Sequence, residues 1–519
     1  MKTAYKFLFA LALLWSISSC TDYEELEINE NKPAQVPASI VLNGVLNDIY
    51  ERPWSLEHRW NQYWNCNYNY YGNQEYAWTT VTLNFSALKN VLKMEEEAIR
   101  GGGKEVNPYS ALGKFFRAYF YFRMTRQVGD LPLNEALKGL ENPIPQYDSQ
   151  KEIFIQILAW LDEANSDLAK LIQENDLSLT GDFMMNNDLK KWQKVVNTFK
   201  LRVLINLSKK SGDGDLKVIE KFTQVVNDPS TYPIMISRDD DLQYLYNGTT
   251  NIYPLHPGNR GFDKGRYNHA ATYLNKLSEL HDPRVFVVAN PAMKMINEDG
   301  LAPDDFRAYI GASSGESLAD MTVKAGNDEY SFINQKRYYT TLTGPEPGLI
   351  LGFAEMNFNI AEAINRGWIT GDAALHYERG IRASMGFHGI SEGTVLSITE
   401  PDQDDQIGTY TVSLEGYLAQ PDVAYAGNNS TGLSQILTQK YLAFFQNSGR
   451  EAYFSHKRTG IPAFLTGEGT GRNPAVIPNR FQYPSNESRV NQAHYSEALN
   501  RQYGNTDDSI DDVVWFLKD

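Results

Sequence analysis

The chain contains very little cysteine, and its histidines do not stand at metal-binding spacings. It has two cysteines, Cys20 and Cys66, and the first lies at the end of an N-terminal leader. The mature chain therefore has no disulfide framework, and Cys66 is expected to be a small buried hydrophobic residue. None of the eight histidines belongs to an H-E-x-x-H pattern. The sequence thus gives no support to a zinc site.

The chain also lacks an excess of positive charge and, after its leader, any long apolar run. It has 48 basic and 64 acidic residues, a formal net charge of −16. This balance argues against binding to nucleic acid or to anionic lipid. No stretch after the leader approaches the ~20 apolar residues that a membrane-spanning helix needs. Charge alone does not identify a substrate.

Motifs for catalysis and for phosphate binding are missing or incomplete. Residues 311–315 spell G-x-S-x-G, but no apolar strand precedes them and no helix pattern follows, so a loop is expected. No P-loop or G-x-G-x-x-G occurs. Residues 239–241 and 402–405 are acidic but complete no EF-hand loop, and solvated loops are expected there. We predict a protein that is not an enzyme and has no metal or cofactor, although carboxylate pairs for glycoside hydrolysis need not be close in sequence.

Aromatic residues are concentrated in one short window. Nine lie between Trp54 and Trp78, where the chain average of 12% predicts about three. Asparagines are interleaved with them. An aromatic face packs against the C–H face of a sugar ring, and amides bond to the hydroxyls around its edge. The alternative is that the rings only pack this segment onto the helices. We predict ligand contact, with these candidates: Trp60, Trp64, Asn67, Asn69, Tyr70 and Trp78 in the window, and Tyr253 and Tyr338 farther along the chain.

Helical periodicity dominates the rest of the chain and predicts a mostly α fold. It indicates helices over 40–50, 83–100, 110–128, 151–174 and 190–210, a hairpin over 349–385, and further helix over 436–460. The helix that begins near Ser110 is apolar on two faces, so other helices should cover it on both sides. Gly129 is placed to end it. The pairing and spacing of these helices predict a scaffold of tetratricopeptide-like hairpins.

Between residues 231 and 348 the periodicity is lost, except near 270–280. Pro, Gly, Asn and Tyr dominate this stretch. Inside a compact domain an irregular segment of such length is usually functional. We therefore predict one domain over 37–519, with a helical scaffold over 37–230 and 349–519 and an irregular insertion over 231–348.

The first residues form a targeting segment. Lys2 and Lys6 precede an apolar run that is too short to span a bilayer and that ends at Ser18-Ser19-Cys20. This ending resembles a bacterial lipobox, which implies a signal peptide over 1–19 and lipidation of Cys20. Residues 20–36 are then a flexible acidic tether. Their acidic run resembles the surface-export signal of Bacteroidota lipoproteins.

Several motifs, in order along the chain, resemble those of the SusD/RagB family. The stretch from Ala111 to Leu133 is similar to the family's ALRAYYYFRLVRLFGDVPL helix, and 361–367 to its AEA-x3-G. The run ILTQKYLAFFQNSGREAYFSHKRTG over 436–460 matches QKYLA…G-x-EAY…RRTG. Residues 480–487 resemble R-x-x-YP-x-x-E, and 513–516 the hydrophobic close of the chain. The resemblance spans Cys20 to Asp519.

The resemblance implies a lipid-anchored protein at the surface of the outer membrane. Such a protein would capture oligosaccharide and deliver it to a SusC-like TonB-dependent transporter. Its site would come from early loops and the insertion, but the family's site residues vary with substrate and cannot be transferred one by one. Three alternatives stay open: a peptide-binding member of the same import system, a surface glycoside hydrolase, and a purely structural helical adaptor.

Overall fold

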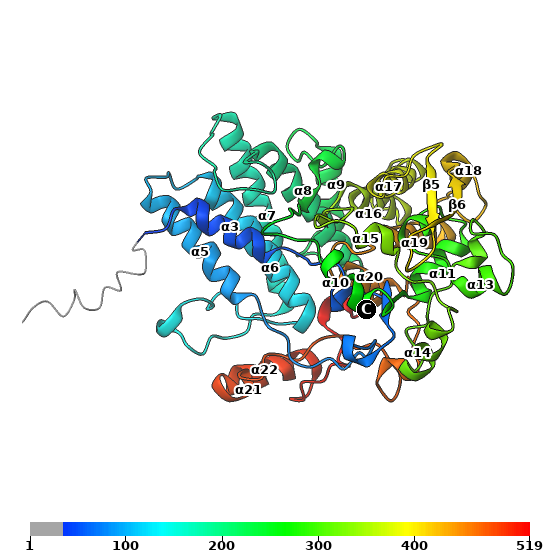
Figure 1. Ribbon diagram of the computed structural model, residues 1–519. Helices are drawn as coiled ribbons and strands as arrows, with labels where there is room; N and C mark the ends of the chain where they lie inside the picture. The colour runs from blue at the N-terminus through cyan, green and yellow to red at the C-terminus, as the bar shows by residue number, and fades with distance from the viewer. Residues whose placement is uncertain (1–34) are drawn as a thin grey trace, which may run out of the picture.

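A row of consecutive helices forms one side of the molecule (Figure 1). The structure is a computed structural model that describes residues 35–519. The row consists of α3 (Ala38–Asp48), α5 (Phe85–Arg100), α6 (Pro108–Val128), α7 (Gln150–Gln173), α8 (Leu189–Asn206) and α9 (Val218–Asn227). Each helix packs on the next. The predicted helical scaffold is confirmed here, and α9 is an addition that periodicity did not indicate.

Helix α6 is the central helix of this row, as its two apolar faces predict. Phe115, Phe116 and Phe120 are fully buried, because α5 covers one side and α7 the other. The Asn107 side chain accepts hydrogen bonds from the amides of Tyr109 and Ser110 and so caps the N-terminus. Gly129 follows the helix with φ 100°, a backbone conformation that favours glycine.

A second group of helices continues the scaffold beyond α8. It contains α16 (Phe353–Asn365), α17 (Ala373–Phe387), α19 (Ser430–Ala443) and α20 (Glu451–Thr459). Helix α16 packs on α8 as well as on α17 and α19, and it thereby joins the two groups. The expected hairpin over 349–385 is confirmed. The stretch 436–460 contains the end of α19 and the whole of α20, which are connected by residues 444–450.

The stretch from 231 to 348 is more ordered than its sequence indicates. Besides the expected helix, α11 (Ala271–Glu279), it has five short ones: α10 (Pro257–Asp263), α12 (Val285–Val288), α13 (Met293–Asn297), α14 (Leu318–Gly326) and α15 (Gln335–Tyr338). Strand β2 (Leu242–Tyr244) pairs with β4 (Gly348–Leu351), which begins at the last residue of this stretch. Beyond the stretch, β5 (Val395–Thr399) forms a hairpin with β6 (Gln406–Thr411). Helices of four to nine residues are too short for a 3.6-residue period to stand out.

One strand pair connects the aromatic window to this middle stretch. Strand β1 (Trp64–Cys66) runs antiparallel to β3 (Tyr267–His269), with Trp64 opposite His269 and Cys66 opposite Tyr267. All three residues of β1 are buried, so the strand is covered on both faces. The pairing joins segments about two hundred residues apart, and it positions the loop that follows β1.

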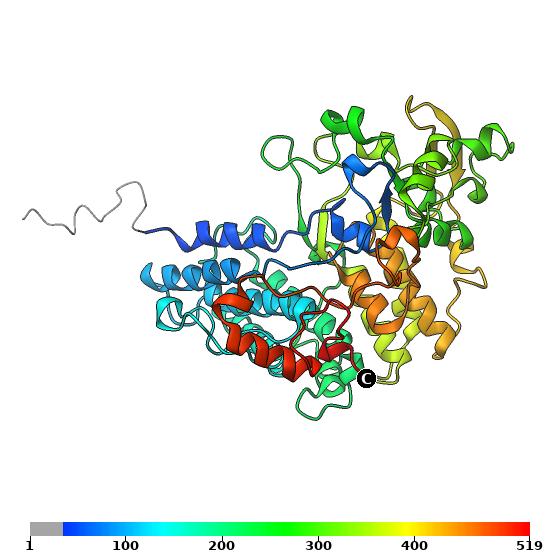
Figure 2. The same cartoon turned by 90° about the horizontal axis from the view of Figure 1, so that it is seen from below.

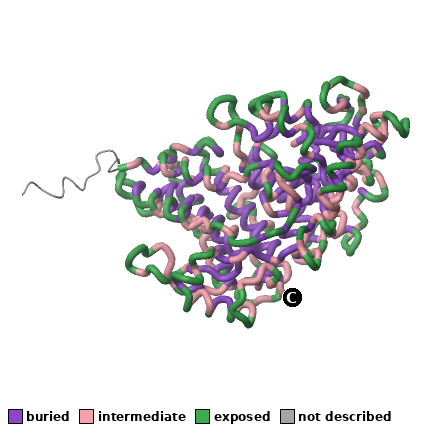
Figure 3. Tube along the Cα trace, turned by 60° about the horizontal axis from the view of Figure 1, so that its bottom comes forward, coloured by how far each residue is buried: buried purple, intermediate pink, exposed green. Residues whose placement is uncertain are grey.

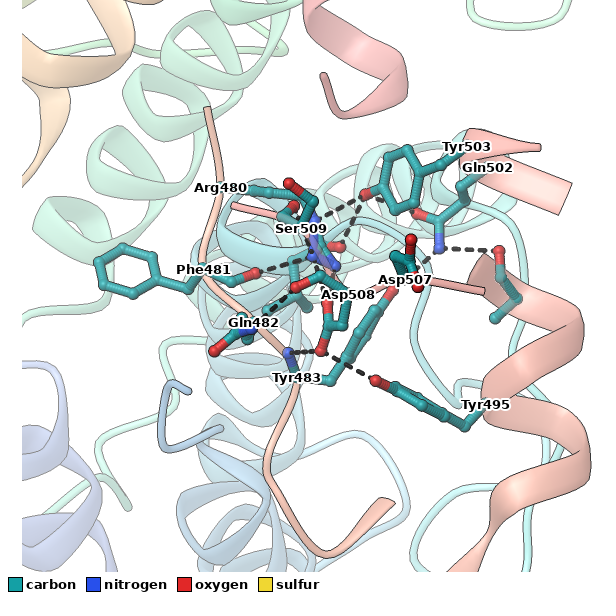
Figure 4. A network of polar contacts seen from close by, with 12 residues as sticks. Arg480, Phe481, Gln482, Tyr483, Tyr495, Gln502, Tyr503, Asp507, Asp508 and Ser509 are labelled. Carbon is teal, nitrogen blue, oxygen red and sulfur yellow. Dashed lines mark hydrogen bonds and ion pairs between the residues drawn. The ribbon is translucent and has the colours of Figure 1, made fainter. Parts of the chain in front are cut away.

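The C-terminal segment, with α22 (Gln492–Tyr503), folds back along the first row of helices (Figure 2). The Arg480 guanidinium pairs with Asp508 and donates to the Tyr503 hydroxyl at 3.1 Å, and Asp508 also accepts from the Tyr483 amide at 2.8 Å (Figure 4). The Tyr483 hydroxyl in turn donates to the carbonyl of Asp130, just beyond α6, at 2.7 Å. These contacts hold the end of the chain against the central helix.

Buried residues follow the helices through the middle of the molecule, and exposed residues lie mainly on loops and at the periphery (Figure 3). Within residues 35–519, none of the helices combines the length and apolarity needed to cross a bilayer.

Candidate functional site

The aromatic window separates into an inner and an outer set of rings. It begins at Trp54 before α4 (Leu56–Trp60), passes through β1 and reaches the short 3-10 helix η1 (Asn69–Tyr71). Residues 61–67, which include β1, are buried, whereas Asn69 and Tyr70 of η1 are exposed. This division decides which predicted residues can meet a ligand.

Most of the predicted rings are buried, and the expectation that they are open to solvent is wrong. Trp64 is 2% exposed and Trp78 is 4% exposed. The Trp78 ring stacks on Phe481 with 4.0 Å between ring centroids. Tyr253 and Tyr338 are also buried: the first accepts a hydrogen bond from the Trp54 indole at 2.8 Å, and the second packs edge-on against the same indole. The large apolar area of these rings is removed from water by packing.

Asn67 is buried too, and its amide is used within the protein. It donates to the Asn268 side chain at 2.8 Å and to the Gly265 carbonyl at 3.2 Å. The backbone amide of Asn67 also donates to the Arg266 carbonyl at 2.9 Å, which extends the β1–β3 pairing by one residue. The predicted role of Asn67 as a partner for sugar hydroxyls is therefore replaced by a structural one.

Three predicted residues keep an accessible surface. Tyr70 is 85% exposed, Asn69 beside it is exposed, and Trp60 is half-buried. Trp60 lies apart from the other two, because its ring contacts Trp78 and Phe481 and its indole donates to the Glu75 carbonyl at 3.1 Å. The structure thus brings together Asn69 and Tyr70 but separates them from Trp60.

Four tyrosines gather around η1, and we call them the tyrosine patch: Tyr68, Tyr70, Tyr71 and Tyr267. The centroid of the Tyr71 ring lies 5.2 Å from that of Tyr70, 6.3 Å from that of Tyr68 and 6.3 Å from that of Tyr267. Tyr68 is 47% exposed. Tyr267 comes from β3, and nothing in its local sequence marked it. Tyr68 and Tyr71 lie in the aromatic window, where the Tyr68-Asn69-Tyr70-Tyr71-Gly72 run was their one signal.

The loop beneath the patch is held by a side-chain clamp. The Gln74 carboxamide accepts from the Cys66 amide at 2.7 Å and donates to the Cys66 carbonyl at 2.8 Å. It therefore acts as a strand partner on the edge of β1 that β3 leaves free. Cys66 is buried, as expected, and burial raises the pKa of its thiol. The thiol stays protonated and donates to the Tyr68 carbonyl at 3.4 Å.

Arg59 fills the space between the loop and the buried core. Its guanidinium carbon lies 4.9 Å from the centroid of the Trp64 ring, a cation–π contact, and its Nη1 donates to the Asn73 carbonyl at 3.2 Å. Gly72 has φ 121°, and a Cβ there would stand 2.1 Å from Arg59 Nη1. Glycine at this position lets the loop close over the arginine. Trp64 thus supports the patch from below without touching solvent.

The acidic and serine-containing motifs offer no alternative site. Asp404 pairs with Arg260 at 2.6 Å, Asp402 with Lys264 at 2.6 Å and Asp240 with Lys194 at 2.9 Å. Among the residues that the structure describes, no group of three His, Cys, Asp or Glu side chains could hold a metal ion. Ser313, the serine of the G-x-S-x-G sequence, accepts from the Gly315 amide at 3.2 Å in an irregular segment, not at a strand-to-helix elbow.

A hollow of about 630 Å³ lies elsewhere, between the start of α5, the 132–147 loop and residues 484–491. Four prolines and Tyr147 line part of it. The tyrosine patch, by contrast, is a group of exposed and partly exposed rings. It can stack against flat apolar faces, and it carries no arrangement of nucleophile, base and orienting group for catalysis.

Comparisons with known proteins agree with this architecture. A SusD homolog from Bacteroides fragilis NCTC 9343 is 31% identical with a TM-score of 0.81, and the match covers 93% of this chain and 100% of that one. An outer membrane protein from Bacteroides vulgatus ATCC 8482, described as involved in nutrient binding, is 30% identical with a TM-score of 0.78 over the same shares.

A chitin-binding SusD homolog from Flavobacterium johnsoniae shares the fold, with a TM-score of 0.68 at 20% identity over 93% of this chain and 99% of that one. A search of curated proteins finds no match. The SusD-like model, described as starch-binding and associating with the outer membrane, matches residues 30–484. The resemblance read from the motifs is confirmed, and the chain belongs to the SusD-like family of outer-membrane-associated proteins.

Proposed function

We propose that this protein is a non-catalytic glycan-binding lipoprotein at the cell surface. It captures oligosaccharide on the tyrosine patch and delivers it to a SusC-like TonB-dependent transporter in the outer membrane. The signal peptide over 1–19, the lipidated Cys20 and most of the tether lie outside the described residues, and they are part of the proposal through the sequence alone.

The observation that carries the proposal is the exposure of Tyr70 and Tyr68 on a braced loop. Exposed large rings are costly to leave in water, and rings that are rigidly held lose little conformational freedom on binding. Asn69 stands between them and can bond to hydroxyl groups at the edge of a sugar ring. Membership of the SusD-like family supports a role in nutrient binding.

The test is a binding titration of the purified protein against a panel of oligosaccharides. Stacking of one ring on a nucleobase is worth about 1–3 kcal/mol, and we take a similar range for a sugar. Tyr70→Ala is therefore expected to weaken binding at least fivefold. Phe183→Ala is the matched control, because it removes an exposed ring that packs on Tyr244, away from the patch. Equal losses in both variants would contradict the proposal.

The same panel separates the alternatives. Release of reducing ends by the wild-type protein would favour a glycoside hydrolase. Binding of peptides but of no oligosaccharide would favour the peptide-binding alternative.

A further inference from the structure

The tyrosine patch carries an arginine with no acidic partner. The guanidinium carbon of Arg266 lies 4.7 Å from the centroid of the Tyr68 ring. Arg266 is exposed, and its side chain makes no ion pair or hydrogen bond with any residue that the structure describes. Its charge is therefore available to a ligand that rests on Tyr68.

The neighbouring cations on the same segment are neutralised, which sets Arg266 apart. Both terminal nitrogens of Arg260 donate to the Asp404 carboxylate, at 2.6 and 2.7 Å. Lys264 pairs with Asp402 at 2.6 Å. The acidic loop around residue 404 thus reaches α10 but leaves Arg266 unpaired.

A second positive charge lies on the other side of the loop. Arg59 makes no ion pair within residues 35–519, and its Nε is buried without an acceptor. Burial lowers the pKa of Arg59 below its ordinary value, but an arginine remains charged at neutral pH. A nearby carboxyl, Asp263, is buried and not on the surface of the patch.

This local charge contrasts with the whole chain, whose formal net charge is −16. The planar guanidinium donates two parallel hydrogen bonds to a carboxylate or sulfate, and this geometry adds specificity to attraction. The Arg266 guanidinium lies over one face of the Tyr68 ring, so a sugar would stack on the other face, and a substituent that extends past the edge of the ring could reach Arg266. A neutral sugar would leave that charge without a counterpart.

We propose that the tyrosine patch selects acidic oligosaccharides, with the sugar ring on Tyr68 and Tyr70 and its carboxylate or sulfate group on Arg266. This inference rests on the proposed function, because it assumes that the patch is the glycan site.

The experiment compares ligand pairs that differ only in the acidic group. An oligogalacturonide and its methyl ester test the carboxylate, and a neutral galactan oligosaccharide and its sulfated form test the sulfate. At low ionic strength we expect the acidic member of at least one pair to bind about two- to fivefold more tightly, the range for an exposed ion pair. The preference should shrink in 0.5 M salt.

Variants assign that preference to the arginine. Arg266→Gln is expected to abolish it and to leave binding of the neutral member unchanged. Arg266→Lys should keep part of it, because the charge remains but the planar fork is lost. Arg489→Gln is the matched control, since it also removes one exposed arginine charge, from α21 (Glu487–Val490), far along the chain.

The outcomes distinguish this inference from the proposed function. If both members of each pair bind equally, and Tyr70→Ala weakens both, the patch is a glycan site without charge selection and the inference alone is overturned. A preference that survives Arg266→Gln would also overturn it. If no oligosaccharide binds, the proposed function fails and the inference fails with it.

Discussion

Trp64 and Tyr70 lie six positions apart in the same aromatic window, yet they have opposite environments. Trp64 is 2% exposed and packs between Arg59 and Tyr267. The centroids of the Trp64 and Tyr267 rings are 4.7 Å apart. The Trp64 indole nitrogen has no hydrogen-bond partner among residues 35–519. Tyr70 is 85% exposed. We therefore expect Trp64 to contribute to the stability of the fold, whereas the Tyr70 ring is accessible to a ligand.

Trp64→Ala is expected to lower the free energy of unfolding by about 3–5 kcal/mol, because it leaves a large cavity in the core. Trp64→Phe should cost less, since it keeps a ring and removes an unpaired N–H group. Tyr70→Ala should change stability by less than about 0.5 kcal/mol. Urea unfolding followed by fluorescence measures all three. A Tyr70→Ala loss as large as that of Trp64→Ala would show that the patch is structural.

At the scale of elements, residues distant in sequence fix where short elements begin and end. The Asp241 carboxylate accepts a hydrogen bond at 2.6 Å from the amide of Phe353, the first residue of α16. This bond pairs one of the free backbone N–H groups at the start of α16, where the N-cap residue Gly352 provides no side-chain hydrogen bond. Burial, with a smaller effect of the neighbouring Asp240 and Asp239 carboxylates, raises the pKa of Asp241 to about 7.

This raised pKa makes the stability of the protein depend on pH. Below an unfolded-state pKa of 3.8 the carboxyl is protonated in both states, and its contribution is fully present. Between that value and about 7 the unfolded chain loses the proton first, so stability falls as pH rises. Asp241→Asn cannot ionise but keeps an acceptor for the Phe353 amide. It should be more stable than wild type by about 1–3 kcal/mol at pH 8, with little difference at pH 4.

Urea unfolding at several pH values measures this difference. The exposed neighbour Asp239 provides the control, since Asp239→Asn removes a carboxylate without touching the helix N-terminus. A constant gap between Asp241→Asn and wild type across the pH range would contradict the assignment.

At the scale of the whole molecule, the motifs of the family resemblance meet one another in the interior. Glu362 of the AEA motif pairs with Arg458 of the RTG motif through two bonds, at 2.5 and 2.9 Å. Lys440 of the QKYLA motif lies 4.0 Å from the same carboxylate. Glu451 of the EAY motif pairs with Arg126 of the central helix at 2.7 Å. These residues hold the helices together and do not form the candidate site.

Glu362→Gln is expected to destabilise the protein by about 3–5 kcal/mol, because it leaves buried cations without their partner. Burial raises the pKa of Glu362, but the Arg458 guanidinium more than offsets this effect, and the pKa of Glu362 falls to about 2. The contribution of Glu362 is therefore present above pH 4.5 and is lost as pH falls toward 2. Denaturant midpoints at pH 7 measure the effect.

Glu415→Gln is the matched control, since it breaks an exposed, solvent-screened pair with Arg382 and should leave the denaturant midpoint almost unchanged. Similar midpoints for Glu362→Gln and the control would refute the structural role of the buried pair.

The sequence by itself determined the helices and the family. Periodicity placed α3, α5, α6, α7, α8, α16 and α17, because long amphipathic helices carry their period in local sequence. The two apolar faces of α6 and the glycine at 129 also followed from local rules. The aromatic window pointed to the segment that carries the patch.

Only the tertiary structure decided which of those rings face water. An aromatic side chain is compatible with a core or with a binding surface, and local sequence does not distinguish the two. The choice depended on the pairing of β1 with β3, on Phe481 beneath Trp78 and on Arg59 beneath Gly72. The same pairing of β1 with β3 brought Arg266 to Tyr68 and Tyr267 to Tyr71. These contacts join residues up to four hundred positions apart, so their energies are set by packing and not by any local pattern.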